Sequence, residues 1–458
     1  MKGFLWYNDS DIQGDFMKLD ARKMTLQILN EMDRTGQFSQ VVLEKNLKSH
    51  QLSAEDRRLI SQLLFGVLEN KLKLDFYIRK LSAQRFSRIH PSIINTLRLG
   101  FYQLEFMDKI PDSAAVNESV KLAKAVSEKD AKFVNGILRN FIRMNKIVSL
   151  PDQSNHFVTY LSIKYSFPEW LVTFWINEYG ADFTEKLLSS SNETPMLSIR
   201  TNTLKIEPKA LLNAFTELGV VCEMSDLIPE GILIKDMNHL SINQLPGYDL
   251  GHFIIQDISS MHVGYLSEVK EGQMVIDVCA APGGKSTHVA QLLNQTGRVL
   301  ARDNQMDKLL RIEENAKRLD LINIETQGFD ALEVDPEYEN RADLVLVDAP
   351  CSGLGIIRRK PDIKYNKSPE DLNALVEVQS AILANASKYV KAGGLLIYST
   401  CTLNRKENQD IVKAFLKDNQ AFGLVPISNN GDTEGMLTLY PNVHGTDGFF
   451  IAKMKKIT

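Results

Sequence analysis

The chain has 458 residues, of which 44% are hydrophobic and 24% charged, with a formal net charge of −4. This length exceeds what one ordinary hydrophobic core takes, so we expect two or three globular domains. No run of about 18 apolar residues occurs, and the first residues show neither the basic start nor the apolar stretch of a signal peptide, so we expect a cytoplasmic protein without a membrane segment.

The front part of the chain has a helical pattern. Residues 1–16 show no periodicity, and we expect them to form a flexible extension outside the fold. In the segment 53–75, Ser53 and Asp56 have capping-box spacing, and apolar residues follow along one helical face. Pro91 suits the first turn of a later helix. We therefore predict an all-helical domain over residues 17–145.

Two segments of this front part, AAVNESVKLAKAV (114–126) and FVNGILRNFIR (133–143), resemble the RNA-binding NusB family. The resemblance implies an all-helical module that engages RNA. Residues 1–150 also hold 24 Lys and Arg against 17 Asp and Glu, while the remainder holds 29 against 40. A basic module suits a polyanionic partner, but an ordinary solvated helical surface explains the excess equally well.

The pattern changes twice after residue 145. Between residues 146 and 165 the helical period stops and turn formers increase, which predicts a linker. Residues 166–245 mix helix-like and strand-like segments, which predicts a small α+β subdomain. Over residues 246–458, short apolar strands (FIIQ, MVIDV, VLAR, LVLV and LLIY) alternate with helix-length segments. This alternation is typical of a doubly wound, mostly parallel α/β sheet, which we expect to have seven strands.

A glycine-rich turn, CAAPGGKST, follows the apolar run at 274–278. A P-loop would need glycine where Cys279 stands, and a dinucleotide fold needs two further glycines that are absent. Asp277, Cys279, Ala281 and Gly283 instead match the S-adenosylmethionine (SAM) turn of class I methyltransferases. The alternative is a loop that only reverses the chain.

Two acids follow the next predicted strands. Asp303 ends GRVLARD, about where a carboxylate that binds a ribose is expected after such a turn. Asp330 follows the short strand IET, where a carboxylate can accept a hydrogen bond from an adenine amino group. Either acid alone is more simply explained as solvent-exposed. Together with the turn, they favour a nucleoside-containing cofactor.

Two of the four cysteines end strand-like runs: Cys351 in LVLVDAPCSGLG and Cys401 in LLIYSTCTLN. No CxxC pair occurs, so we expect neither a disulfide framework nor a metal site. Most free cysteines are small buried hydrophobes. A pair at two strand ends, one of them after Asp348, instead favours covalent catalysis by a thiolate. Methylation of cytosine needs such a nucleophile, because carbon 5 is inert until a group adds at carbon 6.

The segments DVCAAPGGKS, VDAPCSGLGIIRRKPDIKY and YSTCTLNRKENQDIV resemble the NOL/NOP/Sun family of RNA 5-methylcytosine methyltransferases. With a NusB-like front part, they are most similar to its bacterial members that act on 16S rRNA, which implies 16S rRNA as the partner. In that family the TC cysteine is the nucleophile and the PC cysteine assists product release, which implies these roles for Cys401 and Cys351. DNA cytosine methyltransferases use the PC position instead.

The same resemblance implies the other site residues. Asp303 would hold the ribose, Asp330 the adenine, and Asp348 would sit between the methyl donor and the target base. Lys285 would approach the base or the substrate phosphate. The cofactor turn would comprise Cys279, Ala280, Ala281, Pro282, Gly283, Gly284 and Lys285.

A basic run follows Cys351 and predicts an RNA contact close to the nucleophile. A solvated charge run is the ordinary alternative. The resemblance adds two residues of LSIRTNTLK to this RNA-binding set. The predicted RNA contacts are Arg200, Asn202, Arg358, Arg359, Lys360 and Lys364.

Two other functions stay open on the sequence alone. One is a non-enzymatic NusB-like RNA-binding factor that carries a degenerate methyltransferase scaffold. The other is an NTPase, for which only the GGKST segment argues. For the enzyme we expect SAM as the cofactor, 16S rRNA as the substrate, no metal, no membrane partner and a monomer.

Overall fold

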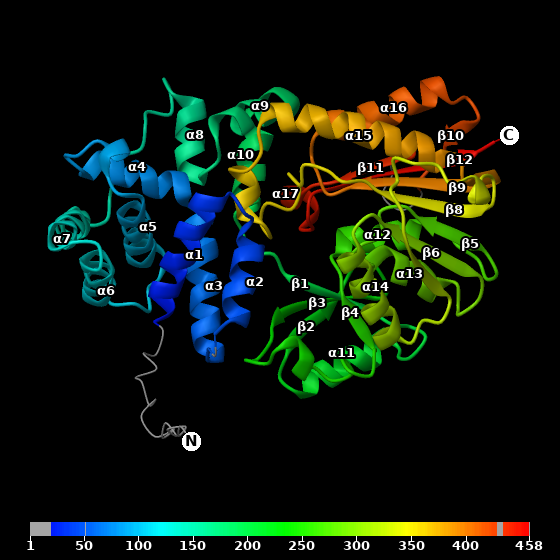
Figure 1. Cartoon of the computed structure of the whole chain (residues 1–458), viewed down its shortest axis with the longest axis horizontal. Coiled ribbons are helices and arrows are strands. Elements are labelled where there is room, and N and C mark those ends of the chain that lie inside the picture. The colour runs from blue at the N-terminus through cyan, green and yellow to red at the C-terminus, as the bar shows by residue number, and fades with distance from the viewer. Residues whose placement is uncertain (1–19, 51, 428–433, 458) are drawn as a thin grey trace, which may run out of the picture. The chain divides into compact units, whose positions relative to one another are not determined.

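The computed structural model of the chain describes residues 20–50, 52–427 and 434–457 (Figure 1). These residues form two compact units. The helical unit comprises the described residues up to Thr184 together with the later segment Lys360–Asn366. The sheet unit comprises Glu185–Arg359 and the described residues from Lys367 onward. The extension predicted at residues 1–16 lies outside the described residues.

The helical unit has the all-α structure that its sequence predicts. Ser53 accepts a hydrogen bond from the Asp56 N–H at the start of α3, and Pro91 is the first residue of α5, as expected from their spacing. The helices are α1 (Ala21–Thr35), α2 (Ser39–Lys48), α3 (Ala54–Glu69), α4 (Lys71–Leu81), α5 (Pro91–Phe106), α6 (Asp112–Lys124), α7 (Glu128–Arg143), α8 (Phe157–Tyr165), α9 (Glu169–Tyr179) and the first residues of α10 (Ala181–Ser190).

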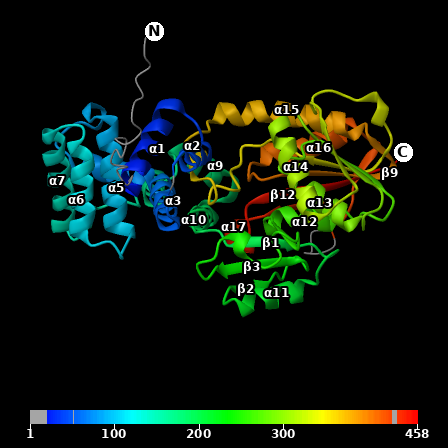
Figure 2. The ribbon, with the colours of Figure 1, turned by 60° about the horizontal axis from the view of Figure 1, so that its bottom comes forward.

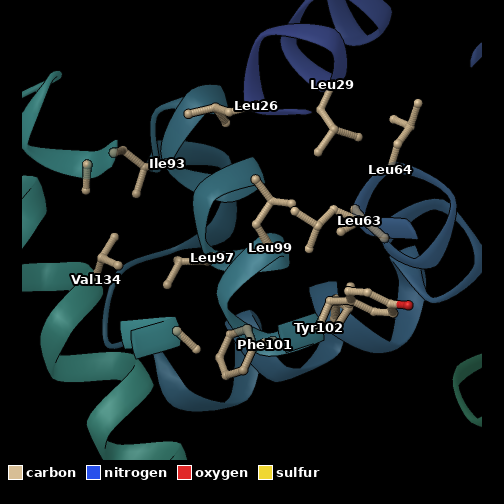
Figure 3. Close-up of a cluster of buried hydrophobic side chains, with 14 of the residues drawn as sticks. Leu26, Leu29, Leu63, Leu64, Ile93, Leu97, Leu99, Phe101, Tyr102 and Val134 are labelled. Atoms are coloured by element: carbon tan, nitrogen blue, oxygen red, sulfur yellow. The ribbon is translucent and has the colours of Figure 1, made fainter. Parts of the chain in front are cut away.

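Helix α5 runs through the core of the helical unit. Figure 3 shows its side chains Leu97 and Phe101 among apolar residues of the neighbouring helices, and both are fully buried. Gly100 allows α6 and α7 to pack closely on α5, because a Cβ atom there would lie only 2.7 Å from the Leu138 side chain and 2.9 Å from Ser119 Oγ.

A buried ion pair joins α4 to α5. Arg98 donates to the two carboxylate oxygens of Asp75 at 2.7 and 2.9 Å, and each side chain is 7% exposed. Asp75→Asn leaves the guanidinium without its main counter-charge, so we expect unfolding of the helical unit to require about 3–5 kcal/mol less. Urea denaturation of the full chain followed by far-UV circular dichroism measures this change. Glu118→Gln, which breaks an exposed pair with Lys121, should cost under about 1 kcal/mol, and an equally small loss for Asp75→Asn would contradict the argument.

The predicted linker at 146–165 differs from the structure, because its second half forms α8. Helix α8 packs against α4 and α9, and its Leu161 side chain is fully buried. The segment FVTYLSIKY is rich in residues of modest helix propensity, so tertiary packing decides its conformation. Helix α9, which was predicted as part of the α+β subdomain, belongs to the helical unit.

The sheet unit contains a small antiparallel sheet with strand order β2-β3-β1-β4. Its elements are β1 (Leu197–Thr201), α11 (Pro208–Glu217), β2 (Val221–Met224), β3 (Gly231–Asp236) and β4 (Phe253–Ile255). The FIIQ segment was predicted to belong to the parallel sheet, but as β4 it pairs antiparallel with β1, Ile199 opposite Ile255. This pairing extends the small sheet beyond the predicted boundary at residue 245.

The large sheet confirms the doubly wound α/β prediction. Its strand order is β10-β12-β9-β8-β5-β6-β7, and β11 pairs with β12, so the described residues give the sheet eight strands where seven were expected. Strands β10 (Phe422–Leu424) and β11 were not predicted. Strands β5 to β9 pair in parallel, whereas β10, β11 and β9 pair antiparallel with β12. The strands are β5 (Met274–Asp277), β6 (Arg298–Asp303), β7 (Ile324–Gly328), β8 (Ala342–Asp348), β9 (Val390–Thr400), β10 (Phe422–Leu424), β11 (Met436–Leu439) and β12 (Phe449–Lys456).

Helices cover both faces of the large sheet (Figures 1 and 2). Successive strand residues point to opposite faces, so Val275 packs in one apolar cluster and Ile276 in the other. One face carries α15 (Pro369–Ser387) and α16 (Gln409–Asp418), and the other carries α12 (Ile258–Leu266), α13 (Gly284–Leu292) and α14 (Met306–Leu319). Within the described part of the chain, no helix has both the length and the apolar character to cross a bilayer.

Candidate active site

The parallel strands β5 to β9 end at one edge of the large sheet, and each end carries a predicted site residue. The glycine-rich turn follows β5. Asp303 ends β6, and Asp330 follows β7. Asp348 ends β8 with Cys351 shortly after it, and Cys401 directly follows β9. The topology therefore gathers segments that lie far apart in the sequence.

The turn between β5 and α13 depends on Gly283 and Asp277. Gly283 precedes the first residue of α13 with φ at 98°, a conformation that favours glycine. The Asp277 carboxylate accepts hydrogen bonds from Ser286 Oγ at 2.5 Å and from the Cys279 N–H at 3.4 Å. Burial raises the pKa of Asp277 to about 7. The role of Asp277 is therefore structural: its hydrogen bonds hold the turn between β5 and α13 in place.

The acids after β6 and β7 retain hydrogen-bonding capacity. Asp303 is 8% exposed and accepts from the backbone N–H groups of Ala281 and Gln305 at 3.3 and 3.1 Å. Asp330 is exposed and accepts from the Leu332 N–H at 2.9 Å. A carboxylate offers about four lone-pair sites, so both acids can accept further donors such as ribose hydroxyls or an adenine amino group. These residues fit a nucleoside-containing cofactor.

The two cysteines after β8 and β9 lie side by side. Their Sγ atoms are 3.4 Å apart, and both side chains are partly buried. The hydrogen bond with Cys401, together with burial and the nearby charges of Glu407 and Asp348, raises the pKa of the Cys351 thiol well above its ordinary value. Either sulfur can donate the hydrogen bond that joins the two thiols.

An ion pair borders the cysteines. Lys285 Nζ lies 2.5 Å from Asp348 Oδ2, with the lysine side chain 9% exposed and the aspartate 31% exposed. Ser399 Oγ donates to the other Asp348 oxygen at 3.2 Å, and the Lys285 ammonium lies 5.1 Å from the centre of the Phe449 ring. These contacts fix the Asp348 carboxylate at the strand end while leaving part of it accessible.

The sequence analysis missed a buried polar cluster behind the cysteines. It centres on Glu407, which is fully buried and accepts hydrogen bonds from Ser352, Gln379 and Asn404. A signal was available, because NRKENQD places an acid shortly after the TC cysteine, between two basic residues and two uncharged polar ones. Nothing in that pattern showed that the acid turns inward.

Two predicted RNA contacts lie inside the sheet unit. Arg200 is fully buried and donates to Gln256, to the Gly284 carbonyl at 2.7 Å and to Thr287 Oγ1 at 3.1 Å. Asn202 is 1% exposed and donates to two backbone carbonyls. Their donors face protein acceptors, so the expectation of a direct RNA contact is corrected: Arg200 supports the glycine-rich turn from β1.

Lys364 was also predicted to contact RNA, and it is fully buried in the helical unit. Its Nζ donates to the Glu69 carbonyl at 3.1 Å and lies 4.0 Å from the centre of the Phe167 ring. Burial lowers its pKa to about 7. This position is incompatible with a phosphate contact, whereas Lys360, in the same segment, is exposed.

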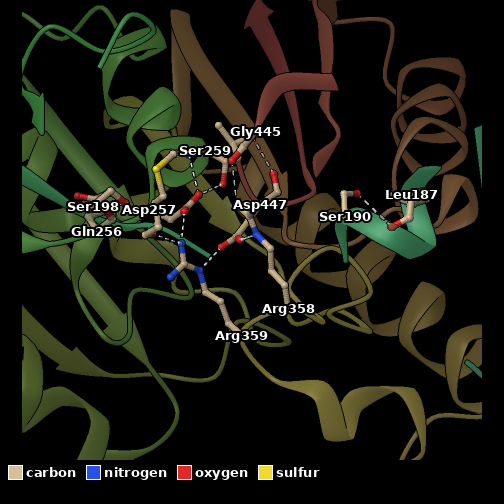
Figure 4. A network of polar contacts seen from close by, with 12 residues as sticks. Leu187, Ser190, Ser198, Gln256, Asp257, Ser259, Arg358, Arg359, Gly445 and Asp447 are labelled. Carbon is tan, nitrogen blue, oxygen red and sulfur yellow. Dashed lines mark hydrogen bonds and ion pairs between the residues drawn. The ribbon is translucent and has the colours of Figure 1, made fainter. Parts of the chain in front are cut away.

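The remaining predicted RNA contacts, Arg358 and Arg359, belong to the network shown in Figure 4. Arg358 donates to Asp447 at 2.6 Å, and Arg359 bridges Asp447 and Asp257, the latter at 2.5 Å. The Arg358 side chain is 7% exposed and that of Arg359 is 29% exposed. These arginines fix the loop after Cys351 through ion pairs that the basic run did not reveal.

Comparison with known families divides the chain into three parts, and the ferredoxin-like part includes α9, which the fold places in the helical unit. The NusB family matches residues 19–143, a ferredoxin-like domain of RsmF/B-like methyltransferases matches 167–240, and the 16S rRNA methyltransferase RsmB/F family matches 265–455. The crystal structure of PH0851 is similar at TM-score 0.79 with 25% identity, covering 95% of this chain and 98% of that one. NSun6 from Pyrococcus horikoshii with SFG is similar at TM-score 0.58 with 26% identity, covering 64% and 99%.

The fold, the site and these matches define a SAM-dependent methyltransferase of ribosomal RNA. A probable ribosomal RNA small subunit methyltransferase B of Bacillus subtilis is 37% identical, covering 96% of this chain and 99% of the relative, and one of Synechocystis sp. is 35% identical, covering 96% and 100%. The chain belongs to the ribosomal RNA small subunit methyltransferase B family. SAM is its cofactor, and the turn after β5 with Asp303 and Asp330 fits it.

Proposed function

We propose that this enzyme methylates carbon 5 of a cytosine in 16S rRNA through a covalent bond between Cys401 and carbon 6 of the base. The observation that carries the proposal is the pair of thiols, 3.4 Å apart at the ends of two parallel strands and next to the Lys285–Asp348 ion pair. Such a pair provides both a nucleophile and a second ionisable group within reach of one base.

The reaction begins at the Cys401 sulfur. As a thiolate, Cys401 adds to carbon 6, and the electron density displaced onto carbon 5 makes that atom nucleophilic. The bound cofactor supplies an electrophilic methyl group. Once carbon 5 carries the methyl group, a water molecule accepts the carbon 5 proton and the electrons of that bond restore the ring double bond. The bond between sulfur and carbon 6 breaks at the same time, and Cys401 leaves as a thiolate.

Asp348 and Cys351 have the remaining roles in the reaction. We assign the Asp348 carboxylate, which Lys285 and Ser399 hold in place, to hydrogen-bond the N3/N4 edge of the base during addition. Cys351, whose sulfur lies 3.4 Å from that of Cys401, is left for a role after methyl transfer. This division agrees with the NOL/NOP/Sun resemblance, in which the TC cysteine attacks and the PC cysteine assists release.

Trapping of the covalent adduct tests the assignment of the cysteines. With SAM and 16S rRNA, Cys351→Ala should accumulate a protein–RNA adduct that survives a denaturing gel, because release is impaired. Cys401→Ala should form none. Cys222→Ala, which changes a cysteine in β2, should behave like the unmodified enzyme. An adduct in Cys401→Ala and none in Cys351→Ala would reverse the roles.

The product tests the chemistry. After incubation with enzyme and SAM, bisulfite sequencing of 16S rRNA should reveal a cytosine that resists conversion, and nucleoside mass spectrometry should identify 5-methylcytidine. A methyl group on another base, or on another atom of cytosine, would refute the proposal.

A further inference from the structure

Glu407 lies in a short 3₁₀ helix, Arg405–Glu407, shortly after Cys401, and its side chain has no solvent exposure. A carboxylate in such a place is costly unless hydrogen bonds compensate for the lost water. The mechanism above gives Glu407 no direct part in the reaction, so its burial needs a separate explanation.

The carboxylate of Glu407 collects four hydrogen bonds. Oε2 accepts from the Ser352 N–H at 2.8 Å and from Gln379 Nε2 at 2.9 Å. Oε1 accepts from Ser352 Oγ at 2.5 Å and from Asn404 Nδ2 at 2.9 Å. All four partners donate, which suits an ionised carboxylate because that group only accepts.

The donors come from three separate segments. Ser352 follows Cys351 directly, Asn404 stands in the loop after Cys401, and Gln379 lies on α15. Gln379 Nε2 also donates to the Pro350 carbonyl at 2.9 Å, so the backbone on both sides of Cys351 is held.

The Cys401 side of the cluster is joined in the same way. Thr402, the residue after Cys401, places its Oγ1 2.7 Å from Ser352 Oγ. Its carbonyl accepts a hydrogen bond from Asn408 Nδ2 at 2.9 Å. The two cysteine loops therefore share one hydrogen-bond network, and Glu407 is the group that contacts both loops and α15.

We propose that Glu407 is a positioning residue that fixes the loops of Cys351 and Cys401 relative to each other, so that both thiols reach the same base. The inference rests on the proposed function for its catalytic consequence, but not for its geometry. A carboxylate at this place has a second effect, since its negative charge is among the causes that raise the pKa of Cys351, after the hydrogen bond with Cys401 and burial.

Disulfide exchange with glutathione tests the positioning without RNA or SAM. Oxidation of the two protein thiols to a Cys351–Cys401 disulfide reduces one glutathione disulfide to two glutathione molecules, so the equilibrium reports the effective concentration of one thiol at the other. Glu407→Gln turns one accepting oxygen into a donor that faces other donors. We expect this variant to lower the effective concentration at least about tenfold, measured by differential alkylation and mass spectrometry.

Misplacement of the two thiols should also slow methyl transfer to 16S rRNA, as a loss of kcat without a loss of SAM binding. In Glu407→Gln we expect kcat to fall on the order of 10²-fold, with the Kd for SAM within about twofold of the unmodified enzyme, because geometry at the reacting groups is lost while cofactor binding is not. Glu377→Gln is the matched control: it changes an exposed glutamate on α15, two residues from Gln379, and should alter neither quantity.

Ser352→Ala is a second test of the proposal, to be used if Glu407→Gln does not fold. It deletes one hydroxyl and should lower the effective concentration severalfold in a folded protein. If folded Glu407→Gln has an effective concentration within twofold of the unmodified enzyme, the proposal is overturned. If Glu407→Gln does not fold, the same result in Ser352→Ala overturns it. Because the exchange needs no catalysis, this result is distinguishable from a failure of the proposed cytosine chemistry.

Discussion

Cys401→Ser should reduce methyl transfer to 16S rRNA by on the order of 10⁴-fold or more, the largest effect expected of a single substitution in this chain. A serine hydroxyl fills the same place after β9 but is scarcely ionised near neutral pH, whereas a thiol has an accessible anionic form. Without the anion nothing adds to carbon 6, and carbon 5 stays inert. Single-turnover transfer of a radiolabelled methyl group measures the loss.

The binding steps should survive this substitution. The cofactor residues follow β5, β6 and β7, while Cys401 follows β9, so calorimetry should give a Kd for SAM within about twofold of the unmodified enzyme. No covalent adduct should form, even in a Cys351→Ala background. If Cys401→Ser transferred methyl groups at an undiminished rate, the nucleophile would have to be another group, and the proposed chemistry would fail.

The sequence predicted the parts of the fold and site that local signals encode. Alternating short strands and helices located most strands of the large sheet, and parallel strands bring their carboxyl ends to one edge. The amino-acid pattern alone therefore indicates that Asp348, Cys351 and Cys401 lie together. Their sulfur–sulfur distance of 3.4 Å agrees with that expectation.

The burial of polar side chains could not be predicted, because it depends on residues distant in sequence. Arg200 donates to a residue on α13, and Lys364 donates to the last residue of α3. Neither the segment LSIRTNTLK, which holds Arg200, nor the basic run that holds Lys364 distinguishes these side chains from solvent-exposed ones. The same limit hid Glu407, whose partners Ser352 and Gln379 lie on other segments of the chain.

The short elements that differ from prediction also depend on tertiary contacts. Strand β4 has three residues and resembles the strands of the parallel sheet in composition, yet it pairs antiparallel with β1. Helix α8 has weak local helix signals and is stabilised by packing on α4 and α9. In both cases the neighbouring surface, rather than the segment itself, determines the structure.

Asp348→Asn should lower kcat by about 10²- to 10⁴-fold, the range expected when a group that hydrogen-bonds or protonates the reacting base is removed. The amide keeps the size of the side chain but loses the charge that pairs with Lys285 at 2.5 Å. Adduct formation should also slow, because the N3/N4 edge of the base is no longer stabilised as Cys401 adds. Rapid-quench measurement of adduct in a Cys351→Ala background separates this step from release.

Lys285→Met should act largely through the same carboxylate, since the lysine is 9% exposed and its ammonium pairs with Asp348. We therefore expect the loss in the double variant to be far smaller than the product of the two single losses, which a double-mutant cycle on kcat measures. Lys391→Met is the matched control, because it removes a lysine paired at 2.5 Å with Asp343, near the opposite end of β8. Independent losses in Lys285→Met and Asp348→Asn would instead show that Lys285 contacts the substrate directly and that its pairing with Asp348 is incidental to catalysis.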